Sequence, residues 1–336
     1  MTSKLGKQTF SFPSKPVLTG WATVAGPREG QGPVGSYFDK VYPDLKLGQT
    51  SFEKAERTLM TTAADLALEK ASVSKDLVDV FLAGDLLNQL VTSNFAAFKI
   101  GAPFFGIYGA CSTFSQSLML AALLVDSGSC QNILGAVSSH NSTAERQYRY
   151  PTEYGAQLPP WSQHTVTGSG AYVVAARGSG PKIELATLGK VQDLGIKDPF
   201  NMGGAMAPAA ADTLFTHFED TGRKPTDYDL VVTGDLGKVG KAMVVELAQR
   251  QGYDLSNNYR DCGEIIYSQE QNFNAGGSGC ACSALVTLGL LFSQNYKRIL
   301  VVATGALHSP TTYQQGENIP SIAHAVSIEF PQGGGN

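Results

Sequence analysis

The stretch Tyr108-Gly109-Ala110-Cys111-Ser112-Thr113 decides the fold of this chain. The apolar run 103–108 predicts a buried strand, and the Ser-, Leu-, Met- and Ala-rich run 115–126 predicts a helix. Cys111 is therefore expected on a sharp turn from strand to helix, where free backbone N–H groups and the helix dipole lower a thiol pKa and favour anions. This geometry suits a nucleophilic cysteine, and it equally suits an anion-binding site without chemistry.

The second half of the sequence repeats the plan of the first half. Three pairs of similar segments occur in the same order: 78–86 with 228–236, 109–112 with 279–283, and 132–137 with 298–303. Three matches in one order indicate a duplicated βαβαβ half. Strands that read as continuous apolar runs between helices are typical of parallel sheets buried on both faces. We predict an α/β protein with a five-layered α/β/α/β/α arrangement and halves at residues 1–179 and 180–336.

The composition excludes several classes of protein. The chain has 336 residues, 43% of them hydrophobic and 16% charged, and the low charged fraction suggests a surface buried by self-association. The net charge of −4 argues against nucleic acid and against a polybasic membrane patch. The five cysteines form no CxxC pair and are expected to be reduced thiols.

No targeting or membrane segment is expected in this sequence. Residues 1–20 lack the apolar core of a signal peptide. The longest apolar runs, 118–125 and 299–303, are far shorter than the roughly 20 residues of a membrane span. If the protein works at a membrane, we expect other proteins to hold it there.

These motifs resemble the thiolase and ketoacyl-synthase superfamily. A cysteine after Gly-Ala on a strand-to-helix turn, inside a duplicated half, is the plan of that superfamily. Residues 168–171 (GSGA) are similar to the Gly-Asp-Gly-Ala strand of ketoacyl synthases, and 275–279 (AGGSG) resembles the Gly-Gly segment before the last catalytic loop of thiolases. The resemblance implies a thiolase-like fold with Cys111 at the position of the nucleophile, and we expect a homodimer.

A narrower resemblance covers nearly the whole chain. Six segments look like the stage V sporulation protein AD family: 83–89, 105–113, 138–147, 150–155, 205–213 and 276–283. The resemblance implies a sporulation protein that binds dipicolinic acid (pyridine-2,6-dicarboxylate) or its calcium chelate. It also implies a place in the forespore or spore, peripheral on the inner membrane. There it would support uptake, and later release at germination, with the stage V sporulation membrane proteins of one channel complex.

The sequence lacks two of the groups that thiolase chemistry needs. Condensing enzymes of the superfamily add His with His or Asn to the cysteine, to activate the thiol and stabilise an oxyanion. The loop after 229–234 offers Asp235 and no histidine, and 276–282 lacks the Gly-His-Pro of thiolases. A carboxylate in place of histidine raises the pKa of a nearby thiol. We therefore expect a non-catalytic pocket in which Cys111 is a vestigial nucleophile.

Two other functions stay open. An acyltransferase or β-ketoacyl synthase-like enzyme could use Cys111 as nucleophile with His140 or His308 as an unusual base. A structural adaptor for a membrane channel would need neither a reactive thiol nor a ligand.

The candidate ligand residues follow from the chemistry of an aromatic diacid. Its ring would stack on tyrosine and its carboxylates would pair with arginine, so the loop 138–155 is the first candidate wall. Carboxylate ligands for calcium are the alternative if the chelate binds. The predicted ligand-binding residues are Cys111, Asp85, His140, Arg146, Arg149, Tyr154, Asp235 and Gly277. No resident metal or cofactor is expected apart from calcium brought by dipicolinate.

Each of these candidates also has a structural explanation. Asp85 and Asp235 occupy matching turns and could simply cap the helices that follow. Arg146 and Arg149 could form salt bridges across a dimer interface, and a tight turn alone would select Gly277.

Overall fold

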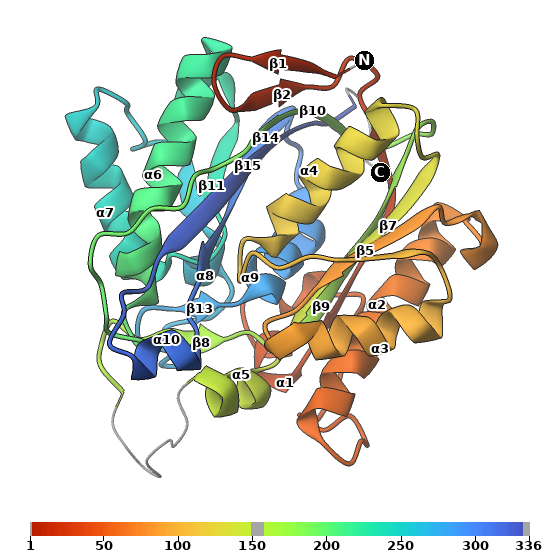
Figure 1. The fold of residues 1–336 in the computed structure, drawn as a ribbon, viewed down its shortest axis with the longest axis horizontal. Helices are drawn as coiled ribbons and strands as arrows, with labels where there is room; N and C mark the ends of the chain where they lie inside the picture. Colours follow the sequence, from red (N-terminus) through yellow and green to blue (C-terminus); the bar gives the residue numbers. More distant parts are fainter. Residues whose placement is uncertain (1, 149–157, 332–336) are drawn as a thin grey trace.

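A long twisted sheet runs through the computed structural model, which describes residues 2–148 and 158–331 (Figure 1). Its main strands are β3 Val17–Ala25, β5 Val80–Gly84, β6 Phe104–Gly106, β7 Asn132–Ser139, β9 Gly168–Ala175, β10 Lys182–Thr187, β11 Leu230–Thr233, β12 Tyr259–Asp261, β14 Arg298–Ala306 and β15 Ser321–Glu329. They follow the order β12-β11-β14-β15-β10-β3-β9-β7-β5-β6.

The two halves of this sheet have the same topology. In the first, β5 is parallel to β6 and β7, whereas β9 is antiparallel to both β7 and β3. In the second, β11 is parallel to β12 and β14, whereas β15 is antiparallel to both β14 and β10. The antiparallel pairing of Lys182 with Val17 joins the halves. The predicted repeat of the strand plan is therefore confirmed.

Helices fill the space between the halves and cover both outer faces (Figure 1). The helices that do so are α2 Phe52–Ala71, α3 Val91–Ile100, α4 Thr113–Asp126, α6 Met202–Thr221, α7 Gly237–Arg250 and α9 Cys280–Leu285. α4 and α9 lie between the two parts of the sheet, with α2 and α3 outside the first part and α6 and α7 outside the second. Three apolar cores separate these layers, which gives the predicted α/β/α/β/α arrangement.

The local sequence explains why α2 forms where it does. Ser51 is its N-cap, and its Oγ accepts a hydrogen bond from the Lys54 N–H at 3.3 Å. Ala55, Leu59 and Ala63 recur at helical spacing and are fully buried against the sheet. The helix ends at Ser72, which has a left-handed backbone with φ of 54°.

Two local predictions were wrong. The run 103–108 forms only the short strand β6, and Phe105 is 57% exposed because β6 lies at the end of the strand order. The segment 138–155, predicted to be loop, contains the helix α5 Asn141–Tyr148. Its polar composition hides the helical pattern, since Thr143 and Ala144 are the side chains that it buries.

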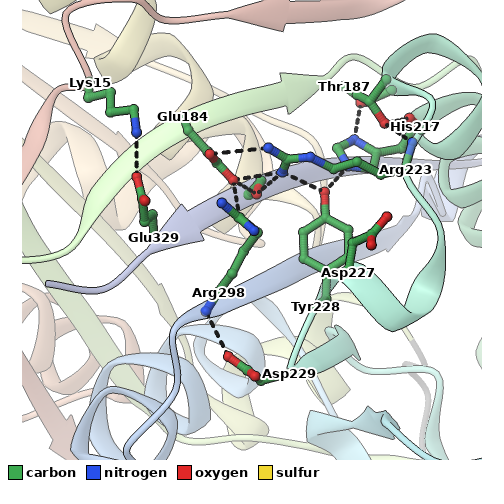
Figure 2. Close-up of polar contacts among 12 residues, drawn as sticks. Lys15, Glu184, Thr187, His217, Arg223, Asp227, Tyr228, Asp229, Arg298 and Glu329 are labelled. Atoms are coloured by element: carbon green, nitrogen blue, oxygen red, sulfur yellow. Dashed lines mark hydrogen bonds and ion pairs between the residues drawn. The ribbon is translucent and has the colours of Figure 1, made fainter. Parts of the chain in front are cut away.

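A buried polar network connects β10 with the start of β14 and the end of β15 (Figure 2). Glu184 on β10 accepts hydrogen bonds at 2.7 Å from Arg223 and Arg298, and from the Ser327 hydroxyl. Burial opposes its ionisation, but the hydrogen bonds from Arg223 and Ser327 outweigh burial and lower the Glu184 pKa to about 2. The charge of Glu184 is therefore fully matched inside the fold.

Candidate active-site pocket around Cys111

Cys111 lies on the turn from β6 to α4, as predicted, two residues before the helix begins. Ala110 has a φ of +50°, which is unusual for a residue other than glycine. β14 passes very close to this turn at Gly305, where a Cβ would lie 2.2 Å from the Gly109 oxygen. Only glycine allows this approach, which brings the second half of the chain against the Cys111 turn.

Asp235 and Ser278 from the second half face the thiol. Asp235 follows β11, and Ser278 lies on the short strand β13 Gly277–Ser278. Cys111 Sγ is 3.8 Å from Ser278 Oγ, which donates a hydrogen bond at 2.8 Å to Asp235. Asp235 also accepts from the Thr304 hydroxyl at 2.7 Å and the Gly279 N–H at 3.0 Å. Two loops of the second half are thus fastened to each other beneath the thiol.

These surroundings keep the thiol protonated. Burial raises the pKa of Cys111 well above its usual value, and the negative charge of Asp235 raises it further. Burial also raises the pKa of Asp235, against the effect of its three hydrogen-bond donors. A thiol with a raised pKa forms little thiolate at neutral pH, so Cys111 is a weak nucleophile in this environment.

Two hollows of very different size lie near Cys111. The inner cavity lies directly over the thiol, and its polar lining comes from Cys111, Thr165, Ser278, Tyr148 and His308. Only about 20 Å³ is available there to the centres of water molecules, which is room for about one water. The outer hollow opens to solvent and offers about 270 Å³ by the same measure. A ring-sized ligand therefore fits the outer hollow and not the inner cavity.

The described lining of the outer hollow combines polar and aromatic side chains with three leucines. Its polar lining residues are Asn88, Gln89, Tyr108, Tyr148, His308 and Ser309. No Lys, Arg, Asp or Glu is among the described residues that line it. Gln89 and Leu90 on its rim both have positive φ values, 54° and 56°. Consecutive non-glycine residues in this conformation store backbone strain, which clusters at functional sites.

The predicted ligand residues Asp85 and His140 lie close by but are occupied by structural contacts. Asp85 accepts hydrogen bonds from the Leu87 N–H and from both the N–H and the hydroxyl of Ser93, so it holds the start of α3. His140 is buried, with Nε2 2.8 Å from the Leu45 oxygen and Nδ1 accepting from the Ser142 N–H. Burial lowers the His140 pKa, which favours the neutral ring. Neither side chain lines the inner cavity or the outer hollow.

The remaining candidates are dispersed. Arg146 forms an ion pair with Glu53, has a side chain 57% exposed, and lines a separate surface hollow. Gly277 precedes Ser278, and its carbonyl accepts a hydrogen bond from Gln163 at 2.8 Å. Arg149 and Tyr154 lie outside the described residues. Of the predicted set, Cys111 and Asp235 are thus brought together, whereas Arg146 is not.

Sequence reasoning missed Ser278 as a pocket residue, and it left Tyr148 out of the predicted ligand-binding set although Tyr148 lies in the candidate wall 138–155. Ser278 follows the Gly-Gly segment that was singled out, so its position in the repeat was the available signal. Tyr148 lies in the segment that was predicted to be loop, and only its packing at the end of α5 brings it to the pocket.

Neither a metal site nor a membrane span is found in the described parts of the chain. Within residues 2–148 and 158–331, no group of three or more His, Cys, Asp or Glu side chains could hold a metal ion. No helix in those ranges has the length and apolar character needed to cross a membrane.

Solved structures of low sequence identity share this fold. The 3-oxoacyl-[acyl-carrier-protein] synthase III of Aquifex aeolicus VF5 matches with a TM-score of 0.59 and 14% identity, over 94% of this chain and 99% of that chain. Cerulenin-bound OleA from Xanthomonas campestris also matches with a TM-score of 0.59 and 14% identity, over 97% of each chain. At such identity the likeness shows the fold alone, which is thiolase-like.

Comparison of sequences is more specific. The family model of stage V sporulation protein AD matches residues 6–329. Stage V sporulation protein AD of Bacillus subtilis (strain 168) is 51% identical over 328 residues, which are 96% of this chain and 97% of that protein. The chain therefore belongs to the stage V sporulation protein AD family, a family of sporulation proteins, and it has a thiolase-like fold.

Proposed function

We propose that this protein binds dipicolinate as its calcium chelate in the outer hollow and supports uptake of the compound into the developing spore. The observation that carries the proposal is the lining of the outer hollow, which combines Tyr108, Tyr148 and His308 with amide and hydroxyl groups and has no charged side chain among its described residues. A flat aromatic ring can stack on such walls.

The lack of charged side chains among the described lining residues favours the chelate over the free diacid. Burying an unpaired dianion is costly, whereas calcium neutralises both carboxylates of dipicolinate. Calcium takes about six to eight oxygen ligands, more than one dipicolinate supplies. The side chains of Asn88, Gln89 and Ser309 carry neutral oxygens that could complete the shell.

The pocket works without acyl transfer in this proposal. Its support is the raised pKa of Cys111 and the carboxyl of Asp235 beside it. One observation favours the alternative, an acyltransferase or β-ketoacyl synthase-like enzyme: His308 lines the same inner cavity as Cys111. Incubation with acyl-CoA followed by mass spectrometry separates the two, because the enzyme would leave an acyl group on Cys111 and the binding protein would not.

Titration calorimetry tests the binding directly. Dipicolinate in excess calcium should bind saturably near one ligand per chain, and dipicolinate with a calcium chelator should bind more weakly. Benzene-1,3-dicarboxylate, which lacks the ring nitrogen, is the matched ligand control and should give little heat. Absence of saturable binding both with and without calcium would contradict the proposal.

Two further parts of the proposal concern partners. Two copies pair through the exposed edge of β6 and the neighbouring surface of α3. Phe105 on β6 is 57% exposed, and Phe98 on α3 is 87% exposed. The homodimer then docks on the stage V sporulation membrane proteins of one channel complex, peripheral on the inner membrane of the forespore. Light scattering should give the mass of a dimer, and Phe98→Asp with Phe105→Asp should give the mass of a monomer. Membranes that carry those proteins should bind the chain, and membranes without them should not.

A further inference from the structure

Two side chains separate the inner cavity from the outer hollow. Tyr148 and His308 line both, and no other described residue does. Their ring centroids lie 5.6 Å apart, with the planes tilted by 38°. His308 Nε2 also lies 3.4 Å from the Tyr148 carbonyl oxygen. The two rings therefore form a partition between the Cys111 thiol and the hollow that opens to solvent.

A small set of hydrogen bonds holds Tyr148 in this position. Its hydroxyl donates to the carbonyl of Leu86, to which Gln147 Nε2 also donates at 2.8 Å. The Asn88 N–H in turn donates to Gln147 Oε1 at 2.9 Å. We call these four residues the Leu86 clasp. The clasp joins the last two residues of α5 to the loop after β5.

The loop side of the clasp is fixed and the α5 side is easier to release. Asp85 accepts three hydrogen bonds across the loop, which anchors Leu87 and the first turn of α3. The bonds that hold Tyr148 and Gln147 are between neutral groups, each of which contributes modestly to stability. Thermal motion can therefore break the hydrogen bonds of Tyr148 and Gln147 while the loop anchored by Asp85 keeps its position.

We infer that Tyr148 is a specificity-determining residue of this pocket, because its latched ring confines ligands to the outer hollow and controls access to Cys111. Release of its hydroxyl from Leu86 joins the two hollows and exposes the thiol. A flat ring bound in the outer hollow stacks on Tyr148 and holds the partition shut. The identity of that ligand rests on the proposed function, whereas the partition itself does not.

Alkylation of Cys111 measures the opening. The full-length protein is treated with iodoacetamide, and the rates at Cys111 and Cys130 are followed by peptide mass spectrometry. Cys130 is buried and lines neither hollow, so it serves as the internal standard. Tyr148→Phe keeps the ring and removes both contacts of the hydroxyl, one to the Leu86 carbonyl and one at 3.3 Å to the Tyr108 hydroxyl. It should raise the Cys111 rate at least about fivefold, the effect of losing one neutral hydrogen bond. Tyr148→Ala removes the partition and should raise the rate further.

Two more variants make the test decisive. Tyr313→Phe is the matched control, because the ring centroids of Tyr313 and His308 lie 5.7 Å apart but Tyr313 lines neither hollow. This substitution should leave the Cys111 rate unchanged. Gln147→Leu breaks the clasp without touching the partition ring, and should raise the rate several-fold even if the Tyr148 variants fail to fold. Equal Cys111 rates in the wild type and in every folded clasp variant would overturn the inference.

The same assay separates this inference from the proposed function. Calcium dipicolinate should slow alkylation of Cys111 in the wild type without changing the Cys130 rate. Faster alkylation in the clasp variants without protection by calcium dipicolinate would support the partition and count against dipicolinate as the ligand. Saturable dipicolinate binding together with unchanged Cys111 rates in those variants would refute the partition and leave the proposed function standing.

Discussion

Replacing Glu184 with glutamine should destabilise the folded protein by roughly 3 kcal/mol at neutral pH. The side chain of Glu184 is only 8% exposed and accepts hydrogen bonds from Arg223 and Arg298 (Figure 2). It also accepts a hydrogen bond from the Ser327 hydroxyl. Its pKa falls from 4.5 to about 2 on folding. Each unit of this difference in pKa corresponds to about 1.4 kcal/mol of stability, which gives the stated magnitude. Glutamine resembles the protonated side chain in shape and loses this charge-dependent part.

The pH dependence of the effect follows from its sign. Because the pKa of Glu184 is lower in the folded protein, its contribution is fully present above pH 4.5 and is lost as the pH falls towards 2. The difference in free energy of unfolding between the wild type and Glu184→Gln should therefore shrink with acid. Roughly half of it should remain near pH 3. Urea unfolding of both proteins at pH 7, 5 and 3 measures this difference.

A matched substitution of an exposed glutamate controls for unspecific effects. Glu246 pairs with Arg250 on the surface of α7, where the two side chains are 62% and 70% exposed. Glu246→Gln should change the stability by less than about 0.5 kcal/mol at each pH. The reasoning would be refuted if Glu184→Gln behaved like Glu246→Gln, or if its effect were the same at pH 7 and pH 3.

Four further predictions test the buried acids and the pocket. Glu56→Gln should stabilise the folded protein increasingly as the pH rises above 4.5. Burial and the charge of Asp85 raise the Glu56 pKa, so the carboxyl stays protonated in the folded state at a pH where it ionises in the unfolded state. Urea unfolding of both proteins at pH 5 and pH 8 measures the difference in stability. Asp235→Asn should move alkylation of Cys111 to lower pH, since it removes a negative charge near the thiol, and an unchanged pH profile would count against that charge effect. Cys111→Ser should retain most binding of calcium dipicolinate in calorimetry, and complete loss with an intact fold would mean that the thiol contributes to binding. Arg146→Ala should leave that affinity nearly unchanged, because Arg146 pairs with Glu53 in a separate hollow, and a large loss would place the ligand there instead.

The sequence was sufficient to predict the layers and the position of Cys111. The hydrophobic runs and the repeated segments 78–86 with 228–236 and 109–112 with 279–283 indicate where strands and helices form. In a duplicated fold the order of these elements predicts the order of the strands. The left-handed backbone of Ala110 and the close approach of Gly305 were not predictable in the same way. They depend on how two distant segments pack against each other.

The composition of the ligand pocket could not be predicted for a related reason. Arg146 and Tyr148 are two residues apart on α5, so their side chains leave the helix in different directions. The sequence favoured the arginine because of its charge. The contacts of α5 turn Arg146 towards Glu53 and Tyr148 towards Leu86, and only packing decides this choice.

Asp235 links the raised pKa of the Cys111 thiol to the hydrogen bonds that hold the pocket together. Its three hydrogen-bond donors come from Ser278, Gly279 and Thr304, so it fastens two loops beneath the inner cavity. The same carboxyl raises the pKa of Cys111 and thus disfavours the thiolate. A histidine in its place could activate the thiol but could not accept three hydrogen bonds at once. Asp235 therefore adds hydrogen bonds beneath the inner cavity and at the same time disfavours the thiolate, which agrees with the proposal that the site holds a ligand without transforming it.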